Sequence, residues 1–296
     1  MKLQTNILRS MEVSNKQFAV FILTYGRPEK IHTLEALEKQ GYTGNIFLIC
    51  SSDDKTIDQY KKKNNVIVFN KSDYKGTFDI GDNFEDDRVV VYARNAVYDI
   101  ARDLNIKYFL VLDDDYKSFR YTMDGNNTYL TKQRLIKNLD KVFNKLLNYY
   151  INTNAKTLCI AQDGDFIGGE QARVFKHKLT RKAMNFFICS VDRPFKFIGR
   201  INEDVNTYVR LGTLGDIFLT IVNLRLHQLI TQTNKGGLTE FYLTGGTYVK
   251  SFYTIIFSPS CVKVSILGNH KRLHHRISWN NAIPVLLDPK YKKSVK

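Results

Sequence analysis

The sequence predicts an α/β protein built on a mostly parallel sheet with helices on both faces. Apolar runs at 18–24, 45–50 and 108–112 have the length of buried strands. Segments with helical spacing separate these runs, and this order is typical of a parallel, helix-covered sheet. Ligands of such sheets bind at the carboxyl ends of the strands, so polar residues at those ends are the first candidates for function.

The first predicted unit is a strand, a loop and a helix. The strand at 18–24 stops at Tyr-Gly-Arg-Pro, residues 25–28, and proline suits the first turn of a helix. Apolar residues at helical spacing then extend the helix to Gly41. A second strand at 45–50 is closed by Ser-Ser-Asp-Asp, and a short strand at 66–69 follows a lysine-rich helix.

A polar, aperiodic segment at 71–87 follows the third strand. Loops of this length in compact domains are usually functional or mobile, so we expect it to lie over the site. Spacings of three and four from Ala93 to Leu104 predict a helix that leads into the strand at 108–112. A further helix is predicted at 131–150. Its expected apolar face comprises Leu135, Leu139, Val142, Phe143, Leu146 and Tyr150.

Length and composition favour one large domain over 1–296, with a first half at 18–125 and a second half at 126–296 that mixes strands and loops. No apolar run is long enough to span a membrane, and residues 1–10 lack the apolar core of a signal peptide. The four cysteines are widely spaced and mostly lie in apolar runs, which favours reduced, buried thiols. We therefore expect a cytoplasmic protein without a membrane partner.

The formal net charge is +15, from 44 lysines and arginines against 29 aspartates and glutamates. A charge of this size favours a polyanionic partner, with nucleic acid the leading candidate. A generally lysine-rich proteome is the alternative. The basic residues cluster around 176–182, 271–276 and 290–296.

The most informative stretch is Lys-Tyr-Phe-Leu-Val-Leu-Asp-Asp-Asp at 107–115. Side chains alternate along an extended strand, so Asp113 and Asp115 can point to one side while Asp114 points away. Carboxylate oxygens are the ligands that Mg²⁺ and Mn²⁺ prefer. The pattern favours a metal site with room for a phosphate-bearing ligand, and the alternative is an acidic turn after a core strand.

The other strand ends supply candidates for binding a nucleotide donor. Thr24, Tyr25 and Arg27 would approach the base and ribose, with Arg27 also near phosphate. Asp53 or Asp54 would close the pocket from the second strand.

Two further groups belong to the predicted donor site or lie near it. Arg94, on the helix before the acidic strand end, could counter phosphate charge, and Asp114 belongs to the donor site as well. A second acidic patch, Asn-Glu-Asp-Val at 202–205, begins an amphipathic helix. Asp204 is the predicted base that takes a proton from an acceptor hydroxyl, with Glu203 as its competitor. Helix capping is the alternative role of this pair.

These motifs together resemble a known family. Ala-Arg-Asn-Ala at 93–96, Leu-Asp-Asp-Asp at 112–115 and Asn-Glu-Asp-Val at 202–205 are similar to metal-dependent glycosyltransferases of the GT-A fold, over about residues 18–275. More narrowly, 197–208, 211–218 and 274–281 resemble the phage-encoded TET-associated glycosyltransferases. That group is associated with sugar attachment to hydroxymethylated pyrimidines in DNA.

The resemblance implies metal binding at Asp113 and Asp115, an acid pair near the acceptor, and a late histidine that closes the metal shell. Three histidines qualify: His270 ranks first, His274 second and His275 third. Basic residues around them would hold diphosphate charge, namely Lys271 and Arg272.

The expected activity is transfer of a sugar, with inversion, from a nucleotide-sugar donor to 5-hydroxymethylcytosine or 5-hydroxymethyluracil in DNA. UDP-glucose is the expected donor and Mn²⁺ or Mg²⁺ the expected ion, in a monomer or small homo-oligomer. A phage-encoded enzyme would act in the host cytoplasm. A glycan or lipid acceptor, a two-metal nucleotidyltransferase or nuclease, and a non-catalytic DNA-binding protein are the alternatives.

Overall fold

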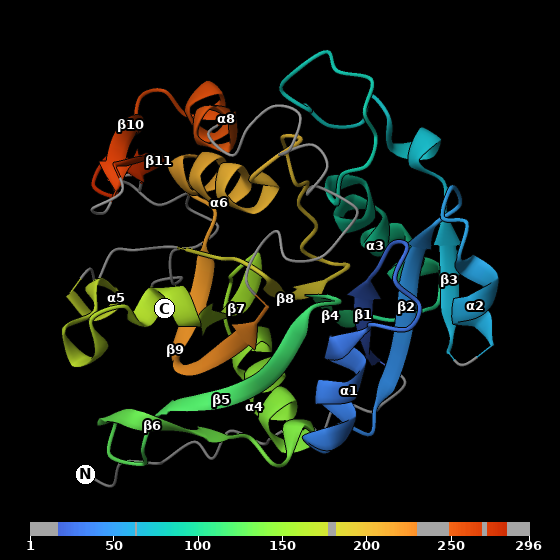
Figure 1. Cartoon of the computed structure of the whole chain (residues 1–296), viewed down its shortest axis with the longest axis horizontal. Coiled ribbons are helices and arrows are strands. Elements are labelled where there is room, and N and C mark those ends of the chain that lie inside the picture. Colours follow the sequence, from blue (N-terminus) through green and yellow to red (C-terminus); the bar gives the residue numbers. More distant parts are fainter. Residues whose placement is uncertain (1–16, 63, 177–181, 230–248, 268–270, 283–296) are drawn as a thin grey trace, which may run out of the picture.

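A computed structural model of the chain describes residues 17–62, 64–176, 182–229, 249–267 and 271–282. Its centre is a nine-stranded sheet with the strand order β3-β2-β1-β4-β8-β7-β9-β5-β6 (Figure 1). A separate two-stranded sheet pairs β10 with β11. In the described part of the chain no helix is long and apolar enough to cross a membrane.

Residues 18–113 form the parallel half of the sheet. Its strands pair in parallel, with β1 between β2 and β4 and with β3 at the edge. The strands are β1 (Phe18–Leu23), β2 (Asn45–Ser51), β3 (Val66–Phe69) and β4 (Tyr108–Asp113). The helices between them are α1 (His32–Lys39), α2 (Ile57–Lys61) and α3 (Val91–Asp103). All of these elements agree with the sequence predictions to within a few residues.

The chain after residue 115 extends the same sheet. Its strands are β5 (Tyr116–Met123), β6 (Tyr129–Leu135), β7 (Thr157–Gln162), β8 (Phe186–Ser190) and β9 (Phe218–Gln228). Strand β8 is antiparallel to both β4 and β7, and β5 is antiparallel to both β9 and β6, whereas β7 and β9 are parallel. Two strands, β8 and β5, therefore oppose the common direction, and the predicted mostly parallel α/β class is confirmed.

The remaining helices and the small sheet complete the described fold. These elements are α4 (Leu139–Ile151), α5 (Arg173–Lys176), α6 (Glu203–Thr213), α8 (Val249–Phe257), β10 (Val262–Leu267) and β11 (Arg272–Ile277). Three short 3-10 helices are also described. One follows β3, namely η1 (Lys71–Tyr74), and two follow β7, namely η2 (Asp163–Phe166) and η3 (Gly169–Gln171).

The predicted helix at 131–150 is wrong in its first part. Residues Tyr129–Leu135 form the edge strand β6, which pairs with β5, and α4 begins only at Leu139. The Asn138 side chain accepts a hydrogen bond from Lys141 N at 2.8 Å, which caps the true start of the helix. Leu135 is 54% exposed, so it does not belong to the apolar face assigned to it.

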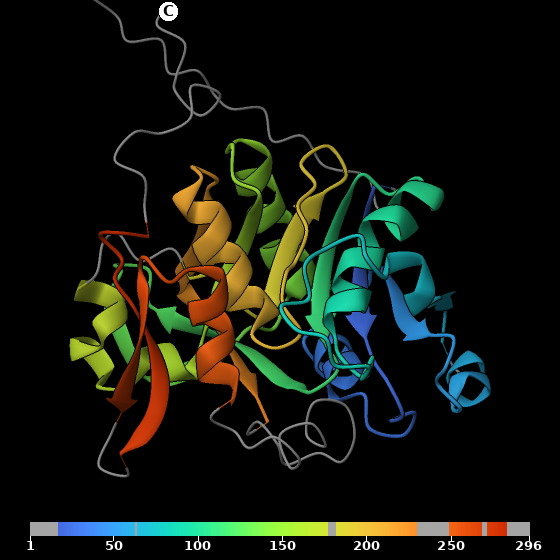
Figure 2. The ribbon, with the colours of Figure 1, turned by 90° about the horizontal axis from the view of Figure 1, so that it is seen from above.

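Helices cover both faces of the sheet, with a core on each side. Residues of α1 and α4 pack with one set of strand side chains, and residues of α3 and α6 pack with the alternate set. All four cysteines are buried and free, as expected. The view from above in Figure 2 shows α6 and α8 together, beside the ribbon formed by β10 and β11.

The segment at 71–87 has little regular structure beyond η1, as predicted, and it packs against the turn before α6. Gly199 N donates to Asp79 O at 2.8 Å, and Arg200 N donates to Ile80 O at 2.9 Å. The Arg200 side chain is 1% exposed and is paired with Asp82 at 2.9 Å. The segment at 71–87 therefore stabilises the turn that leads into α6.

Candidate active site

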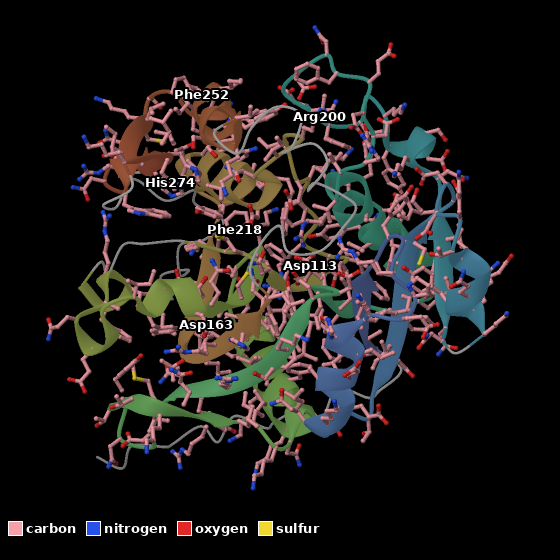
Figure 3. All side chains as sticks on the ribbon, viewed as in Figure 1. Asp113, Asp163, Arg200, Phe218, Phe252 and His274 are labelled. Atoms are coloured by element: carbon pink, nitrogen blue, oxygen red, sulfur yellow. The ribbon has the colours of Figure 1, made fainter. Side chains whose placement is uncertain are left out.

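The acidic end of β4 lies at the carboxyl edge of the parallel strands. Along β4, Phe109 and Val111 belong to the core on the α3 side, whereas Leu110 and Leu112 belong to the core on the α1 side. This alternation directs Asp113 toward the α3 and α6 face. Figure 3 shows the labelled Asp113 near the middle of the molecule.

Arg94 joins the two acidic patches that the sequence placed far apart. From α3, its Nη2 lies 3.0 Å from Asp113 Oδ1, and its Nε donates to Glu203 Oε1 at 2.7 Å. The Arg94 side chain is 2% exposed and lies over the rings of Phe187 and Phe197. Burial by itself would lower the pKa of Arg94, but the two carboxylates raise it above its usual value. The strand end and the start of α6 therefore share one site.

Asp114 points away from Arg94 and Asp113, and it bonds to the loop that follows β1. Thr24 Oγ1 donates to one carboxylate oxygen of Asp114 at 2.8 Å, and Arg27 Nη1 donates to the other at 3.0 Å. The Tyr60 hydroxyl accepts a hydrogen bond from Arg27 N at 2.7 Å and lies 3.1 Å from Thr24 Oγ1. Three predicted donor-site residues, Thr24, Arg27 and Asp114, are thus brought into direct contact.

The end of β2 holds the other side of the same loop. Gly26 has a φ of +69°, a conformation that favours glycine, and its N–H donates to Asp54 Oδ2 at 2.7 Å. Asp53 is more exposed and is paired with Lys71 at 2.9 Å. The Lys71 ammonium lies 5.0 Å from the centre of the Tyr25 ring, so Tyr25, Asp53 and Lys71 gather at the strand ends.

Asp115 has a different environment from its neighbours. Burial, followed by the charges of Asp113 and Asp114, raises the pKa of Asp115 to about 7. Among the residues that the structure describes, its carboxylate forms no ion pair. A partly buried anion beside other carboxylates is stabilised by a cation, so the oxygen donors of Asp113 and Asp115 fit a divalent metal ion.

Asp204 is the second carboxylate of the site without an ion pair in the described residues. It is 7% exposed, and its Oδ1 accepts a hydrogen bond from Val205 N at 2.7 Å. Burial and the adjacent Glu203 raise its pKa well above that of an ordinary aspartate. A raised pKa suits a general base that operates near neutral pH. Glu203, by contrast, is held by Arg94.

The predicted C-terminal residues lie on or near the β10–β11 ribbon. His270 and the side chain of Arg272 lie outside the described residues, and Lys271 is exposed just before β11. His274 is on β11, well apart from Asp113 in Figure 3, and its ring lies 4.3 Å from that of His275. Within the described residues no group of three or more histidine, cysteine or acidic side chains could hold a metal ion. The histidine ligand therefore stays a prediction.

Sequence reasoning missed a polar cluster at the ends of β7 and β9. His227 Nδ1 is hydrogen-bonded to Asp163, whose other oxygen lies 3.3 Å from Arg225 Nη1. Leu229 N donates to Asp115 O at 3.2 Å, so the end of β9 lies beside the acidic strand end. His227 and Asp163 are 64 positions apart, and no local motif marks either residue.

A group of carboxamides adjoins this cluster. Asn185 Nδ2 donates to Gln162 Oε1 at 2.7 Å and to Gln228 Oε1 at 3.0 Å. The Tyr116 hydroxyl donates to the Asn185 carbonyl and lies 3.2 Å from Asp113 Oδ2. Amide donors and acceptors therefore border the site on the side of the second half of the chain.

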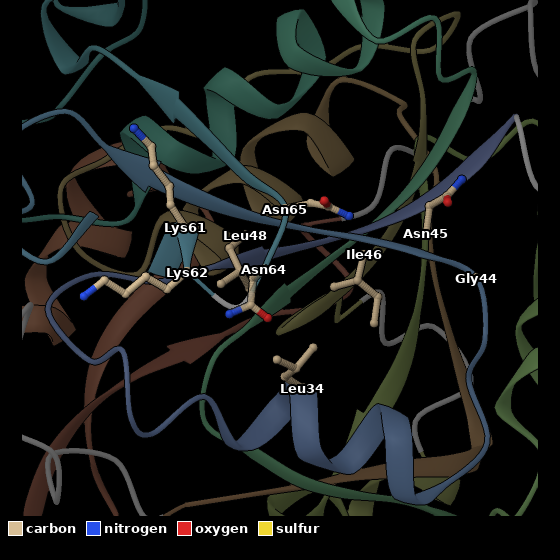
Figure 4. A pocket seen from close by; sticks show the side chains of 9 residues that line it. All are labelled: Leu34, Gly44, Asn45, Ile46, Leu48, Lys61, Lys62, Asn64 and Asn65. Carbon is tan, nitrogen blue, oxygen red and sulfur yellow. The ribbon is translucent and has the colours of Figure 1, made fainter. Parts of the chain in front are cut away.

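A pocket of about 500 Å³ lies elsewhere, at the amino-terminal end of β2 (Figure 4). Leu34 of α1, Asn45 and Ile46 of β2, and Asn65 before β3 contribute to its lining. The acidic residues after β4 lie at the opposite ends of the strands, so this pocket is separate from the site described above.

Solved structures that are similar to this chain include the following two. Glucosyl-3-phosphoglycerate synthase from Mycobacterium tuberculosis, crystallised with Mg²⁺ and uridine diphosphate, is 12% identical. The match covers 88% of this chain and 87% of that chain, with a TM-score of 0.42. TarS of S. aureus is 14% identical, over 80% of this chain and 39% of that chain, with a TM-score of 0.41. No curated protein matches the sequence.

Residues 18–237 match the family described as TET-Associated Glycosyltransferase. The match spans the loop after β1, the acidic end of β4, and α6 with its Glu203 and Asp204. It covers well over half of the chain. This protein therefore belongs to the TET-associated glycosyltransferase family, and it is a glycosyltransferase.

Proposed function

We propose that this enzyme transfers a sugar from a nucleotide-sugar donor to the hydroxymethyl group of a modified pyrimidine in DNA. The observation that carries the mechanism is the pair of carboxylates without an ion pair in the described residues. Asp115 and Asp204 both have raised pKa values, although arginines neutralise the acidic residues beside them. Asp115 is suited to bind a cation, and Asp204 is suited to accept a proton.

Asp113 and Asp115 are the residues that would hold the metal ion, Mn²⁺ or Mg²⁺. When bound, the ion would offset the negative charge that develops on the departing diphosphate. The predicted histidine ligand is His270, with His274 as the second choice. His227 is a further candidate, because it lies two positions before Leu229, whose N–H bonds to Asp115 O.

The donor would lie across the ends of β1, β2 and β4. Thr24, Tyr25 and Arg27 border the proposed nucleoside pocket, and Asp53 and Asp54 close it from β2. A nucleotide sugar is the expected donor, with UDP-glucose as the first candidate. Lys271 and Arg272 would cover the diphosphate from the C-terminal ribbon.

One hydrogen-bond donor of Arg94 supports the phosphate-binding role that is predicted for this residue. Its Nη1 is buried and has no hydrogen-bond partner among the described residues. The other nitrogens of the guanidinium hold Asp113 and Glu203. Arg94 therefore orients two carboxylates, and its Nη1 is the group that would donate to a ligand oxygen.

Asp204 is the proposed general base. As the acceptor oxygen forms its bond to the anomeric carbon, Asp204 takes the proton of the hydroxymethyl O–H group. The bond between the anomeric carbon and the diphosphate breaks, and its electron pair leaves with the diphosphate. Attack from the face opposite the leaving group inverts the anomeric configuration. Glu203, held by Arg94, is the competing candidate for the base.

The DNA acceptor is supported by the family and by the net charge of +15. Lysine and arginine would contact phosphates, and a base within a duplex must leave the stack to reach an enclosed site. The proposed setting is the cytoplasm, where a phage-encoded enzyme would meet its DNA, and the proposed state is a monomer or small homo-oligomer.

The test incubates the protein and Mn²⁺ with UDP-glucose, or with another nucleotide sugar, and DNA that contains hydroxymethylcytosine or hydroxymethyluracil. Digestion to nucleosides and mass spectrometry should reveal an added hexose or pentose. Asp204→Asn should abolish it, whereas Asp192→Asn, which alters an exposed partner of Lys107, should not. If no donor labels either DNA while saccharides or lipids stimulate donor turnover, the glycan or lipid acceptor is favoured instead.

A further inference from the structure

The β10–β11 ribbon has two chemically different faces. Its antiparallel register places Lys263 opposite Arg276 and Ser265 opposite His274. Because side chains alternate along each strand, these four residues share one face. The other face carries mainly apolar residues, namely Val262, Val264, Ile266, Leu273, His275 and Ile277. The ribbon is therefore amphipathic, with one basic and polar face and one mainly apolar face, on which Val264 and Ile266 are exposed.

The cross-strand pair of Lys263 and Arg276 is the informative feature. Both side chains are exposed, and neither has an ion pair with any residue that the structure describes. Like charges directly opposite each other destabilise an antiparallel pair. Lys271, also exposed, adds a third cation just before β11. An arrangement that weakens the free ribbon is stabilised when a polyanion binds to it.

The ribbon is fastened to the helix that carries the proposed base. Trp279, just after β11, stacks on Tyr208 of α6, with ring centres 5.9 Å apart and ring planes at 10°. Ser251 of α8 donates to Leu273 O at 3.3 Å, and the Asn202 side chain before α6 donates to Lys250 O at 2.6 Å. Figures 1 and 2 show the ribbon, α8 and α6 side by side. A ligand on the ribbon would thus be placed relative to α6.

We propose that the basic face of the β10–β11 ribbon binds the sugar-phosphate backbone of the acceptor DNA. This inference rests on the proposed function and adds the surface that holds the duplex. Contacts of this kind position the DNA without reading its sequence. The Trp279–Tyr208 stack would then relate the bound backbone to Asp204, so that an extruded base has a fixed approach to the site.

The test compares two double variants that each remove two positive charges. Lys263→Gln with Arg276→Gln alters the ribbon. Lys141→Gln with Lys145→Gln alters α4, on the opposite side of the sheet, and serves as the matched control. Binding to a hydroxymethylcytosine duplex is measured from about 50 to 200 mM salt, a range over which phosphate contacts weaken strongly. Thermal unfolding checks that each variant is folded.

The ribbon variant should reduce the slope of log K against log salt by about 2, because each lost phosphate contact removes about 1. Its KM for DNA should rise, whereas the α4 variant should match the parent enzyme. A ribbon variant with an unchanged slope, or an α4 variant with the same loss, would overturn the proposal. If the parent enzyme labels DNA but the ribbon variant binds normally, only this inference fails. If the parent enzyme neither binds nor labels DNA, the proposed function fails with it.

Discussion

Replacement of Arg94 by methionine tests whether one guanidinium holds the two acidic patches together. Arg94 is 2% exposed, and its partner Glu203 is 6% exposed, so this ion pair is fully desolvated. Removing one partner of a buried pair costs about 3 to 5 kcal/mol, because the other charge stays buried and unpaired. Asp113 is 27% exposed and can regain water more easily, so it should add little to the loss. We expect the free energy of unfolding to fall by about 3 to 5 kcal/mol.

The measurement is urea unfolding of the metal-free protein, followed by circular dichroism. Arg102→Met is the control, because Arg102 is on the same helix but its pair with Asp99 is exposed. That variant should lose less than about 1 kcal/mol. The double variant Arg94→Met with Glu203→Met should recover much of the loss, since apolar residues can replace a buried ion pair. If Arg94→Met unfolds at the same urea concentration as Arg102→Met, the reasoning about the bridge is wrong.

Three further predictions concern the carboxylates. Asp115→Asn should lower transfer by more than about 100-fold and weaken Mn²⁺ binding in titration calorimetry, whereas Tyr60→Phe should mainly raise the KM for the donor. The rate of transfer should fall as pH drops through the raised pKa of Asp204, and an acidic limb at an ordinary carboxyl pKa would contradict its role as base. Asp115 has a raised pKa in the folded protein, so its contribution to stability is present below pH 3.8 and is lost as pH rises through about 7. The metal-free protein should therefore melt at a higher temperature at pH 5 than at pH 8, and Asp115→Asn should reduce that difference.

The parallel half of the fold could be predicted because its signals are local. Strands β1, β2 and β4 are apolar runs with polar residues at their carboxyl ends, so the sequence itself marks where each strand stops. The prediction of a helix at 131–150 was wrong in its first part because it used local signals alone. Residues 129–135 form an edge strand whose partner, β5, is not indicated by any local pattern. Leucines that fitted a helical face are instead divided between a strand and a helix.

The site was predictable in its residue types but not in its pairings. The alternation along β4 predicted that Asp113 and Asp114 would face different ways, and their partners bear this out. Arg94 and Glu203 are 109 positions apart, and nothing near either residue indicates that they meet. Contacts of this kind depend on how the sheet brings distant strand ends together, which one sequence does not reveal.

The charge balance of the site explains why its acidic residues differ in their proposed roles. Arg27 pairs with Asp114, and Arg94 pairs with Asp113 and Glu203. Within the described residues, Asp115 and Asp204 are then left without a cation, and both have raised pKa values.

A permanent cation beside a carboxylate lowers the pKa of that carboxylate, which makes it a weaker base. A carboxylate that acts as a base therefore works best without an ion pair. A carboxylate without an ion pair also has its charge free to bind a metal ion. The two arginines thus hold Asp114 and Glu203 in the structure, whereas Asp115 and Asp204 are available for chemistry, and Asp113 is both a partner of Arg94 and a proposed metal ligand. Replacing Glu203 by glutamine should consequently lower the pKa of Asp204, because its negative neighbour is gone, and should shift the acidic limb of the rate profile to lower pH.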